Sequence, residues 1–353
     1  MKILHVITLA ELGGAQSVVI NLAEKLVEQG HQVFVASSLH GEMWNVLHKD
    51  VVQIKLKNLH HAIGLKDILV LNELRNIYCR IKPDIIHLHS SKIGILGRLC
   101  FPKSKIVYTV HGFDSIRLRY RKFLPIERAL KKRCKAIVGV SQYDTSNLLK
   151  ENIKDNVYLV RNGIKDFALY NNEAKSENIL YRIKQQSGKK IILSISRLAP
   201  PKRFDLFCKL AEAFLDSSYQ FVWIGNKEDV IEIPENVIML GEREDAHKYY
   251  KYADLALLLS DYEGLPISLI EALCYSKPII ASDVGGISEL LDENGILVSN
   301  ENLSEIINSI TFILANQNIY EKFAKNSRQI FESKFTIEKM YSKYMDLYTY
   351  NTK

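Results

Sequence analysis

Short runs of β-branched residues alternate with longer amphipathic segments along the whole chain of 353 residues. This alternation is typical of parallel β-sheets whose two faces are covered by helices. The first half of the chain is predicted to form strands at 2–8, 32–36, 84–88, 105–110, 136–140 and 157–160. The second half is predicted to form strands at 190–195, 220–224, 237–240, 254–259 and 278–281. The sequence therefore predicts an α/β protein built from two units of the same kind.

The length is about twice that of a usual domain, which also favours two domains. Residues 165–189 are polar, contain one helical candidate at 176–186 and predict a hinge. We expect a first domain at 1–164 and a second at 165–335. The end of the chain, 336–353, is aromatic enough to require packing, and we expect it to form a helix that returns to the first domain.

Positive charge is concentrated in one segment. The chain has a net charge of +7, whereas residues 117–135 alone contain nine Lys and Arg and one Glu, a net charge of +8. Apolar residues interleave with these cations, so an anionic membrane surface is a better partner than nucleic acid. A solvated helix is the alternative. The cations expected to face the acceptor and the membrane are Arg117, Arg119, Arg121, Lys122, Lys131 and Lys132.

The cysteine content and the hydropathy of the sequence exclude several classes of protein. The five cysteines contain no Cys-x-x-Cys pair, so neither a zinc site nor a disulfide framework is predicted and a reducing cytosol is expected. No uninterrupted apolar stretch reaches about 18 residues, so we expect no membrane-spanning helix.

The most informative stretch follows the predicted strand at 254–259. Glu263 stands before Gly264, Leu265 and Pro266, and Glu271 follows inside a predicted helix. Open α/β sheets bind ligands at the carboxyl ends of their strands. A carboxylate in apolar surroundings, such as that of Glu271, usually has a specific partner. Two solvated glutamates on a surface helix are the alternative.

Two further elements follow strands in the same half. Gly285 and Gly286 come after the strand at 278–281, where backbone N–H groups and a helix dipole would attract an anion. Arg197 and Lys202 follow the strand at 190–195. Paired glycines alone equally serve a turn, and a basic loop alone is equally a solvated one. The three elements together favour a nucleoside diphosphate linked to a sugar.

These residues resemble the retaining nucleotide-sugar glycosyltransferases of family 4, over essentially the whole chain. The most specific part is the pair Glu263 and Glu271, eight positions apart, with Gly264-Leu265-Pro266 between them. The resemblance implies the GT-B fold, in which two Rossmann-like domains face each other across a cleft. It also implies that Glu271 binds the ribose, that Arg197 and Lys202 hold the diphosphate, and that Glu263 and the following amides contact the donor sugar.

In the first half, the resemblance implies a glycine loop near the donor at Gly13-Gly14 and a sugar-positioning histidine at His111. A single histidine at a strand end is more often structural, but Gly112 leaves room for a substrate beside His111. His89 is the weaker candidate. The chain departs from the family pattern at a few positions, which are Gln16, Lys165, Ser196 and Arg203.

The expected activity is transfer of a hexosyl or N-acetylhexosaminyl group from a nucleoside diphosphate sugar, with UDP favoured, to a glycan or lipid-linked acceptor. The setting implied by the resemblance is bacterial capsule, exopolysaccharide or lipopolysaccharide synthesis, on the inner face of the cytoplasmic membrane. The expected catalytic residues are His111, Glu263, Arg197 and Lys202. The expected donor-binding residues are Gly13, Gly14, Arg197, Lys202, Glu263, Gly264, Leu265, Glu271, Gly285 and Gly286.

We expect neither a metal nor another cofactor. Asp261-Tyr262-Glu263 resembles an acidic metal motif, but two cations are available to neutralise the leaving diphosphate without Mg²⁺. The alternatives are a sugar-nucleotide epimerase on the same fold and a non-catalytic partner subunit. A nicotinamide dehydrogenase is disfavoured because the first turn lacks Gly-x-Gly-x-x-Gly.

Overall fold

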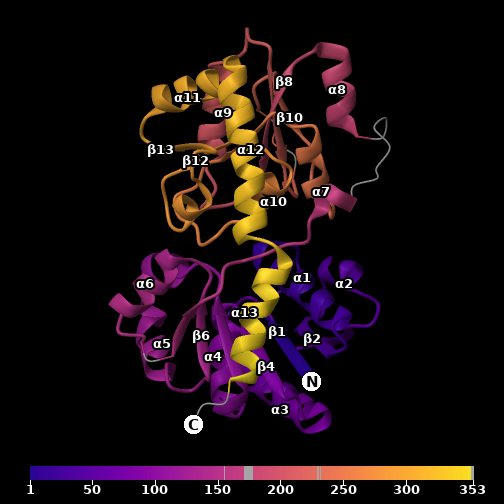
Figure 1. Ribbon diagram of the computed structural model, residues 1–353. Helices are drawn as coiled ribbons and strands as arrows, with labels where there is room; N and C mark the ends of the chain where they lie inside the picture. Colours follow the sequence, from indigo (N-terminus) through magenta and orange to yellow (C-terminus); the bar gives the residue numbers. More distant parts are fainter. Residues whose placement is uncertain (155, 171–177, 229, 231, 351–353) are drawn as a thin grey trace. The chain divides into compact units, whose positions relative to one another are not determined.

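The computed structural model describes residues 1–154, 156–170, 178–228, 230 and 232–350. The chain divides into two compact units (Figure 1). The first unit is Met1–Gly163 together with Ile337–Lys353, and the second is Ile164–Thr336. The sequence predicts these divisions at 164 and 336, within one residue of the observed ones. The last helix therefore belongs to the first unit although the second unit precedes it in the chain.

The first unit contains a sheet of parallel strands in the order β3-β2-β1-β4-β5-β6-β7. Buried strands lie at its centre, as the apolar runs predict. The edge strand β3 is not predicted, because its first residues, Val52 and Gln53, are exposed and its apolar signal is weak. The strand bounds are β1 Lys2–Ile7, β2 Gln32–Ser38, β3 Val52–Leu56, β4 Ile85–His89, β5 Ile106–Val110, β6 Ala136–Gly139 and β7 Val157–Leu159.

Helices cover this sheet. Helix α1 begins where the glycine loop ends and buries Val18, Val19, Leu22 and Leu26, the apolar face that its sequence predicts. The α-helices of the unit are α1 Gly14–Glu28, α2 Met43–Val46, α3 Asp67–Ile81, α4 Ser91–Cys100, α5 Leu124–Leu130, α6 Gln142–Lys150 and α13 Ile337–Thr349. The basic segment also forms a π-helix, η2 Ser115–Arg119, and a 3₁₀ turn, η3 Arg121–Phe123; another 3₁₀ turn is η1 Lys103–Lys105.

Helix α13 is bound to the first unit by polar contacts inside the core. The hydroxyl of Tyr344 lies 2.9 Å from the Oγ1 of Thr109, and the hydroxyl of Tyr348 lies 2.6 Å from the Nδ1 of His87. Both tyrosines are buried. At the surface, the Nζ of Lys25 on α1 lies 3.3 Å from a carboxylate oxygen of Glu338. These contacts explain why a terminal helix carries so many aromatic residues.

A buried ion pair joins α4 to α5. The Nη2 of Arg98 donates to the Oε2 of Glu127 over 2.6 Å, and both side chains are almost fully buried. Burial raises the pKa of Glu127, while Arg98 pulls it down. Glu127 is the one acid within the basic segment 117–135. Because it pairs with Arg98 in the core, it does not neutralise the cations at the surface of the segment. Breaking such a pair is costly because it leaves one buried charge unpaired.

The second unit contains a second sheet of parallel strands, in the order β10-β9-β8-β11-β12-β13. Its strands are β8 Lys190–Ile195, β9 Tyr219–Ile224, β10 Val237–Met239, β11 Leu255–Leu258, β12 Ile279–Ser282 and β13 Gly295–Val298. The short edge strand β13 is not predicted from the sequence. The helices are α7 Phe167–Tyr170, α8 Ile179–Ser187, α9 Phe204–Glu212, η5 Ala246–Lys251, α10 Ile267–Cys274, η6 Ile287–Leu290, α11 Leu303–Ala315 and α12 Gln317–Lys334.

The predicted hinge at 165–189 contains α7 and α8, so much of it is ordered helix. The predicted helix at 176–186 corresponds to α8, and residues 176 and 177 lie outside the described part of the chain. The strand order has a larger consequence: β8 lies beside β11, and β11 beside β12. Because all three are parallel, the loops that follow them meet at one edge of the sheet.

Candidate functional site

In the second unit, the three predicted elements come together. Arg197 and Lys202 follow β8, Glu263 follows β11, and Gly285 follows β12. Lys202 forms an isolated antiparallel bridge with Ser260, which ties the loop after β8 to the loop after β11. The sequence predicts the three elements one by one, and the order of the strands shows that they are neighbours.

The cations of this site differ in their partners. The Nζ of Lys202 bonds the Oε1 of Glu263, and both side chains are largely buried. Arg197 is exposed, and its guanidinium forms no hydrogen bond or ion pair with the described residues. Arg203, a departure from the family pattern, bonds Asp205 over 2.9 Å and Asp261 over 3.3 Å. It therefore braces the loop instead of adding unpaired positive charge.

Gly285 allows two loops to meet. Its φ is +60°, and a Cβ at this position would lie 1.8 Å from the carbonyl oxygen of Glu263. The neighbouring Gly286 donates its N–H to the carbonyl of Gly264 over 3.0 Å. Only a four-residue 3₁₀ helix, η6, follows the glycine pair, where the sequence predicts a regular helix. The observed role of the pair is thus to position residues 263–264.

Glu271 lies in the middle of α10, as the sequence predicts, with Pro266 at the N-cap. Its carboxylate is partly buried, and the residues that the structure describes form no hydrogen bond or ion pair with it. Burial raises the pKa of Glu271 to about 8. The sequence predicts a specific partner for this carboxylate, and the described protein residues do not supply one. A ligand that donates hydrogen bonds would satisfy it.

In the first unit, the glycine loop and His111 occupy the carboxyl edge of the other sheet. Gly13 is the N-cap of α1, and the Nε2 of Gln16 donates to the carbonyl of Leu9 over 2.8 Å. His111 directly follows β5. Because β1, β4 and β5 are neighbours, the loop and His111 lie at the ends of nearby strands.

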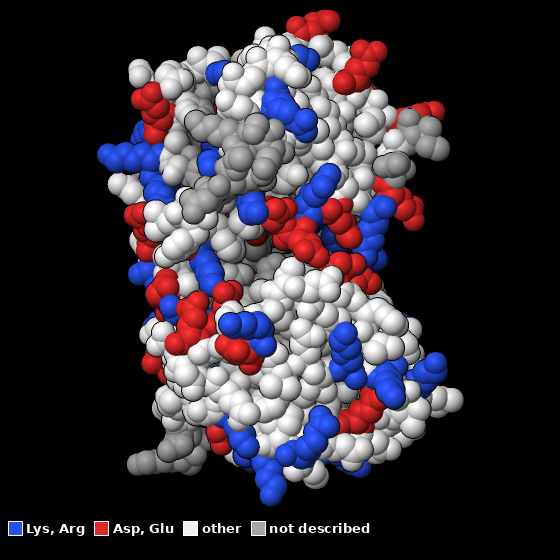
Figure 2. All heavy atoms as spheres, turned by 90° about the vertical axis from the view of Figure 1, so that its right-hand side faces the viewer, with Lys and Arg blue, Asp and Glu red and all other residues white. Residues whose placement is uncertain are grey.

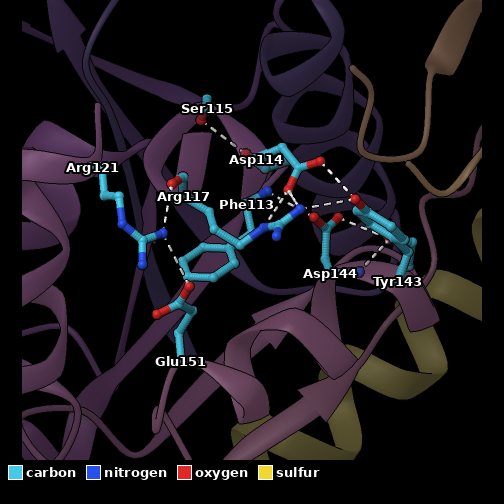
Figure 3. Close-up of polar contacts among 10 residues, drawn as sticks. Phe113, Asp114, Ser115, Arg117, Arg121, Tyr143, Asp144 and Glu151 are labelled. Atoms are coloured by element: carbon cyan, nitrogen blue, oxygen red, sulfur yellow. Dashed lines mark hydrogen bonds and ion pairs between the residues drawn. The ribbon is translucent and has the colours of Figure 1, made fainter. Parts of the chain in front are cut away.

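The turn after His111 is held rigidly (Figure 3). The N–H of Phe113 donates to a carboxylate oxygen of the buried Asp144 over 2.7 Å, and Ser141 donates to the other oxygen over 2.9 Å. The imidazole of His111 is bonded as well, since its Nε2 lies 3.0 Å from the Nδ1 of His89. Burial lowers the pKa of His111 to about 4, which keeps the ring neutral at physiological pH.

His89 is the weaker candidate from the sequence, but in the structure it is hydrogen-bonded directly to His111. A further histidine, His5 on β1, was not singled out from the sequence, yet its Nδ1 lies 3.1 Å from the Nε2 of His89. The sequence carries only a weak signal for this cluster, which is the spacing of His87 and His89 two positions apart on β4. The pairing of His5 with His87 comes from the register of β1 with β4. Only the strand pairing reveals the cluster.

The basic segment is partly neutralised by neighbouring acids (Figure 3). Arg117 lies 2.7 Å from Asp114 and donates to the hydroxyl of Tyr143 over 3.0 Å, while Arg121 lies 3.3 Å from Glu151. The large apolar residues of the segment that remain exposed are Leu118, Tyr120 and Ile126. The exposed cations of the segment are Arg119, Arg121, Lys122, Arg128, Lys132 and Arg133. Lys131, another of the predicted cations, bonds the carbonyl of Asn152 over 2.8 Å.

The same unit has a second exposed apolar surface, which the sequence does not predict. Ile63 and Ile68 are each 61% exposed, and Leu65 is 88% exposed. The loop is held by Lys92, whose Nζ lies 2.6 Å from Asp67 and 2.9 Å from the carbonyl of His60. In Figure 2, which faces the side that carries α2, the first unit shows a broad area of uncharged side chains with Lys and Arg around its lower rim. Among the described helices, none has both the length and the apolar character needed to cross a membrane.

Two family models together match most of the chain. The model for glycosyltransferase family 4 matches residues 12–166, and the model for glycosyl transferases group 1 matches residues 175–330. The chain belongs to the family 4-type glycosyltransferases with the GT-B fold. It is a glycosyltransferase, and its two units correspond to the two matched models.

Two similar proteins from Escherichia coli align with most of this chain. A UDP-Gal:α-D-GlcNAc-diphosphoundecaprenol α-1,3-galactosyltransferase of Escherichia coli is 27% identical over 99% of this chain and 96% of its own. The O-antigen biosynthesis glycosyltransferase WbnH of Escherichia coli is 29% identical over 84% of this chain and 85% of its own. Among solved structures, Anabaena Alr3699/HepE in complex with UDP-glucose has a TM-score of 0.84 and 18% identity, covering 98% of each chain. This last similarity confirms the GT-B fold.

Substituting Gly285 tests whether the two loops must touch. Gly285→Ala should weaken binding of a nucleoside diphosphate about tenfold or more, because the new Cβ must push the backbone of Glu263 away. Gly188→Ala is the matched control, since Gly188 also has a positive φ, +67°, but faces open space. Both variants incur a backbone cost of about 1–2 kcal/mol. Calorimetry that finds equal affinities for the two variants would contradict this role.

Proposed function

We propose that this glycosyltransferase transfers a sugar from a UDP-sugar to a lipid-linked glycan acceptor, with retention of the anomeric configuration and without a metal ion, in the synthesis of a bacterial surface polysaccharide. The carboxylate of Glu271, for which the described residues supply no partner, and the cationic loop after β8 together carry the proposal. A ribose offers two hydroxyl donors to the former, and a diphosphate offers negative charge to the latter. The names of the two Escherichia coli relatives support the acceptor and the pathway, and the UDP-glucose in the Anabaena structure supports the donor.

Donor binding explains the pairing of Lys202 with Glu263. A diphosphate carries more negative charge than one carboxylate, so it competes with Glu263 for the Lys202 ammonium. Lys202 and the exposed Arg197 then stabilise the leaving diphosphate. Glu263 is released to accept hydrogen bonds from the sugar hydroxyls, at a position held by Gly285 and Gly286.

The chemical step follows from these roles. The bond between the anomeric carbon and the diphosphate oxygen breaks, and a bond to the acceptor oxygen forms on the same face of the sugar. The proton of the acceptor hydroxyl passes to the leaving phosphate, so no protein nucleophile takes part. His111 contacts the sugar as a neutral ring, because its lowered pKa keeps it unprotonated.

The acceptor side accounts for the exposed apolar residues of the first unit. The segment that contains Ile63 and Leu65 follows β3, and the segment that contains Leu118 and Tyr120 follows β5. Both therefore leave the carboxyl edge of the same parallel sheet, where His111 also lies. Apolar side chains flanked by Arg119 and Lys122 suit the surface of an anionic membrane, from which a lipid-linked acceptor is collected. We propose that the enzyme acts at the inner face of the cytoplasmic membrane.

Calorimetry with UDP, GDP and ADP tests the donor. UDP should bind most tightly, and its affinity should be the same with Mg²⁺ as with EDTA, because Arg197 and Lys202 replace a metal. Turnover measured with EDTA should likewise be unchanged. Failure of all three nucleotides to bind would overturn the proposed function, and loss of turnover in EDTA would overturn the metal-free mechanism.

The pH dependence of UDP binding tests Glu271. Ribose hydroxyls bond the ionised carboxylate, whereas a pKa of about 8 leaves the carboxyl largely protonated at pH 7. Affinity should therefore rise about tenfold between pH 7 and pH 9. This window lies above the titration of the phosphate, whose second pKa is about 6. Glu271→Gln should bind UDP roughly ten- to hundredfold more weakly at pH 9 and lose the pH dependence. A wild-type affinity that stays flat over this range would argue against the assignment.

Vesicle sedimentation tests the membrane surface. Arg119→Glu combined with Lys122→Glu should weaken binding to vesicles rich in anionic lipid by roughly thirtyfold, from about 1 kcal/mol for each cation removed. Lys325→Glu combined with Lys339→Glu is the control, because it makes the same change in net charge at exposed positions on α12 and α13. Equal losses in the two double variants, or equal binding to neutral vesicles, would exclude a specific membrane-facing segment.

A further inference from the structure

Three imidazoles form a continuous hydrogen-bonded chain in the first unit. The Nε2 of His111 lies 3.0 Å from the Nδ1 of His89, and the Nε2 of His89 lies 3.1 Å from the Nδ1 of His5. The rings of each bonded pair are nearly parallel, with interplanar angles of 21° and 26°. His5 and His89 are fully buried, and His111 is partly exposed at the carboxyl edge. The chain thus leads from the site into the core.

The two ends of this chain are different. At the inner end, the Nε2 of His5 is buried and has no hydrogen-bond partner among the described residues. At the outer end, the Nδ1 of His111 bonds no described residue and is the ring nitrogen left for a substrate. Every bond between them needs one N–H and one lone pair, so the tautomers of the three neutral rings are coupled.

His87 borders the chain but has its own partners. Its Nδ1 lies 2.6 Å from the hydroxyl of Tyr348, and its Nε2 lies 2.7 Å from the Oγ1 of Thr109. His5, His87 and His89 each bring a ring nitrogen within 4.8 Å of the others, a spacing that would suit a metal ion. However, both nitrogens of His87 and of His89 are already engaged, so the arrangement favours a hydrogen-bond chain over a metal centre.

Burial keeps these rings neutral: it lowers the pKa of His5 to about 3 and that of His111 to about 4. Two arrangements of the protons remain. In one, every Nε2 carries the proton, which leaves a buried N–H of His5 without an acceptor. In the other, every Nδ1 carries it, which leaves only a lone pair of His5 unsatisfied. Unpaired buried N–H groups are rarer than unsatisfied acceptors, so the second arrangement is favoured.

We propose that His5 and His89 are positioning residues that hold His111 as its Nδ1–H tautomer, so that His111 donates a hydrogen bond from Nδ1 to an oxygen of the transferred sugar. The contact with the sugar rests on the proposed function, whereas the tautomer is a property of the free protein. In this state Nδ1 has no lone pair and cannot accept a proton, so His111 acts as a donor and not as a general base.

Nitrogen-15 NMR of the full chain, labelled at histidine, tests the tautomer without substrate. The signals of His111 are assigned by their loss in His111→Gln. In the wild type, His111 should show a protonated Nδ1 and an unprotonated Nε2. A protonated Nε2 would overturn the proposal. The result does not depend on nucleotide binding, so a failure of the proposed donor is distinguishable from a failure of this inference.

A matched pair of variants at position 89 tests the positioning role. His89→Asn places an amide where Nδ1 stood, so it can still donate to the Nε2 of His111. His89→Gln places its amide nearer the former Nε2, toward His5. The Asn variant should keep the His111 tautomer and much of the turnover. The Gln variant should lose the tautomer and lower kcat about ten- to hundredfold, with the Kd for UDP within about twofold of the wild type. Equal kcat values for the two variants, or an unchanged tautomer in His89→Gln, would overturn it.

Discussion

The parallel pairing of every strand in the two described sheets is the constraint on which the other features depend. A parallel strand cannot be joined to its neighbour by a tight turn, so each is followed by a crossover that returns the chain to the opposite edge. All the loops that follow strands therefore gather at one edge of each sheet. In the second unit this edge holds Lys202, Glu263 and Gly285, and in the first it holds Gly13 and His111. The backbone hydrogen bonds between parallel strands therefore determine where the loops with the candidate residues lie.

The charges of the protein are matched locally rather than spread over its surface. Glu127 is buried against Arg98, and Arg117 and Arg121 are bonded to Asp114 and Glu151. In the second unit, Arg203 is held by two carboxylates, whereas Arg197 is exposed. A residue count consequently overstates the positive charge that a ligand or a membrane would meet. The partly buried carboxylate of Glu271 is the opposite case, because no described protein residue pairs with it.

Much of the fold is readable in the sequence. The central strands are buried on both faces and form long apolar runs, so they are predicted nearly to the residue. Among the four edge strands, β7 and β10 are predicted whereas β3 and β13 are not, so the partly exposed edges are predicted less consistently than the buried centre. The final helix is predicted to pack because it is aromatic. Its actual partners, His87 and Thr109, lie more than two hundred residues away in the chain and leave no local signal.

The sequence by itself determined which residues are candidates for the chemistry: Glu263 and Glu271, the cations after β8, the two glycines after β12, and His111. These are recognisable because residue type and spacing along one strand–loop–helix segment are local properties. Only the tertiary structure decided which of them meet, since β8 lies beside β11 although more than fifty residues separate the two strands. It also decided that Lys202 pairs with Glu263, and that His5, from the first strand, completes a chain to His111. Pairing between distant strands depends on the packing of whole sheets, which no short pattern encodes.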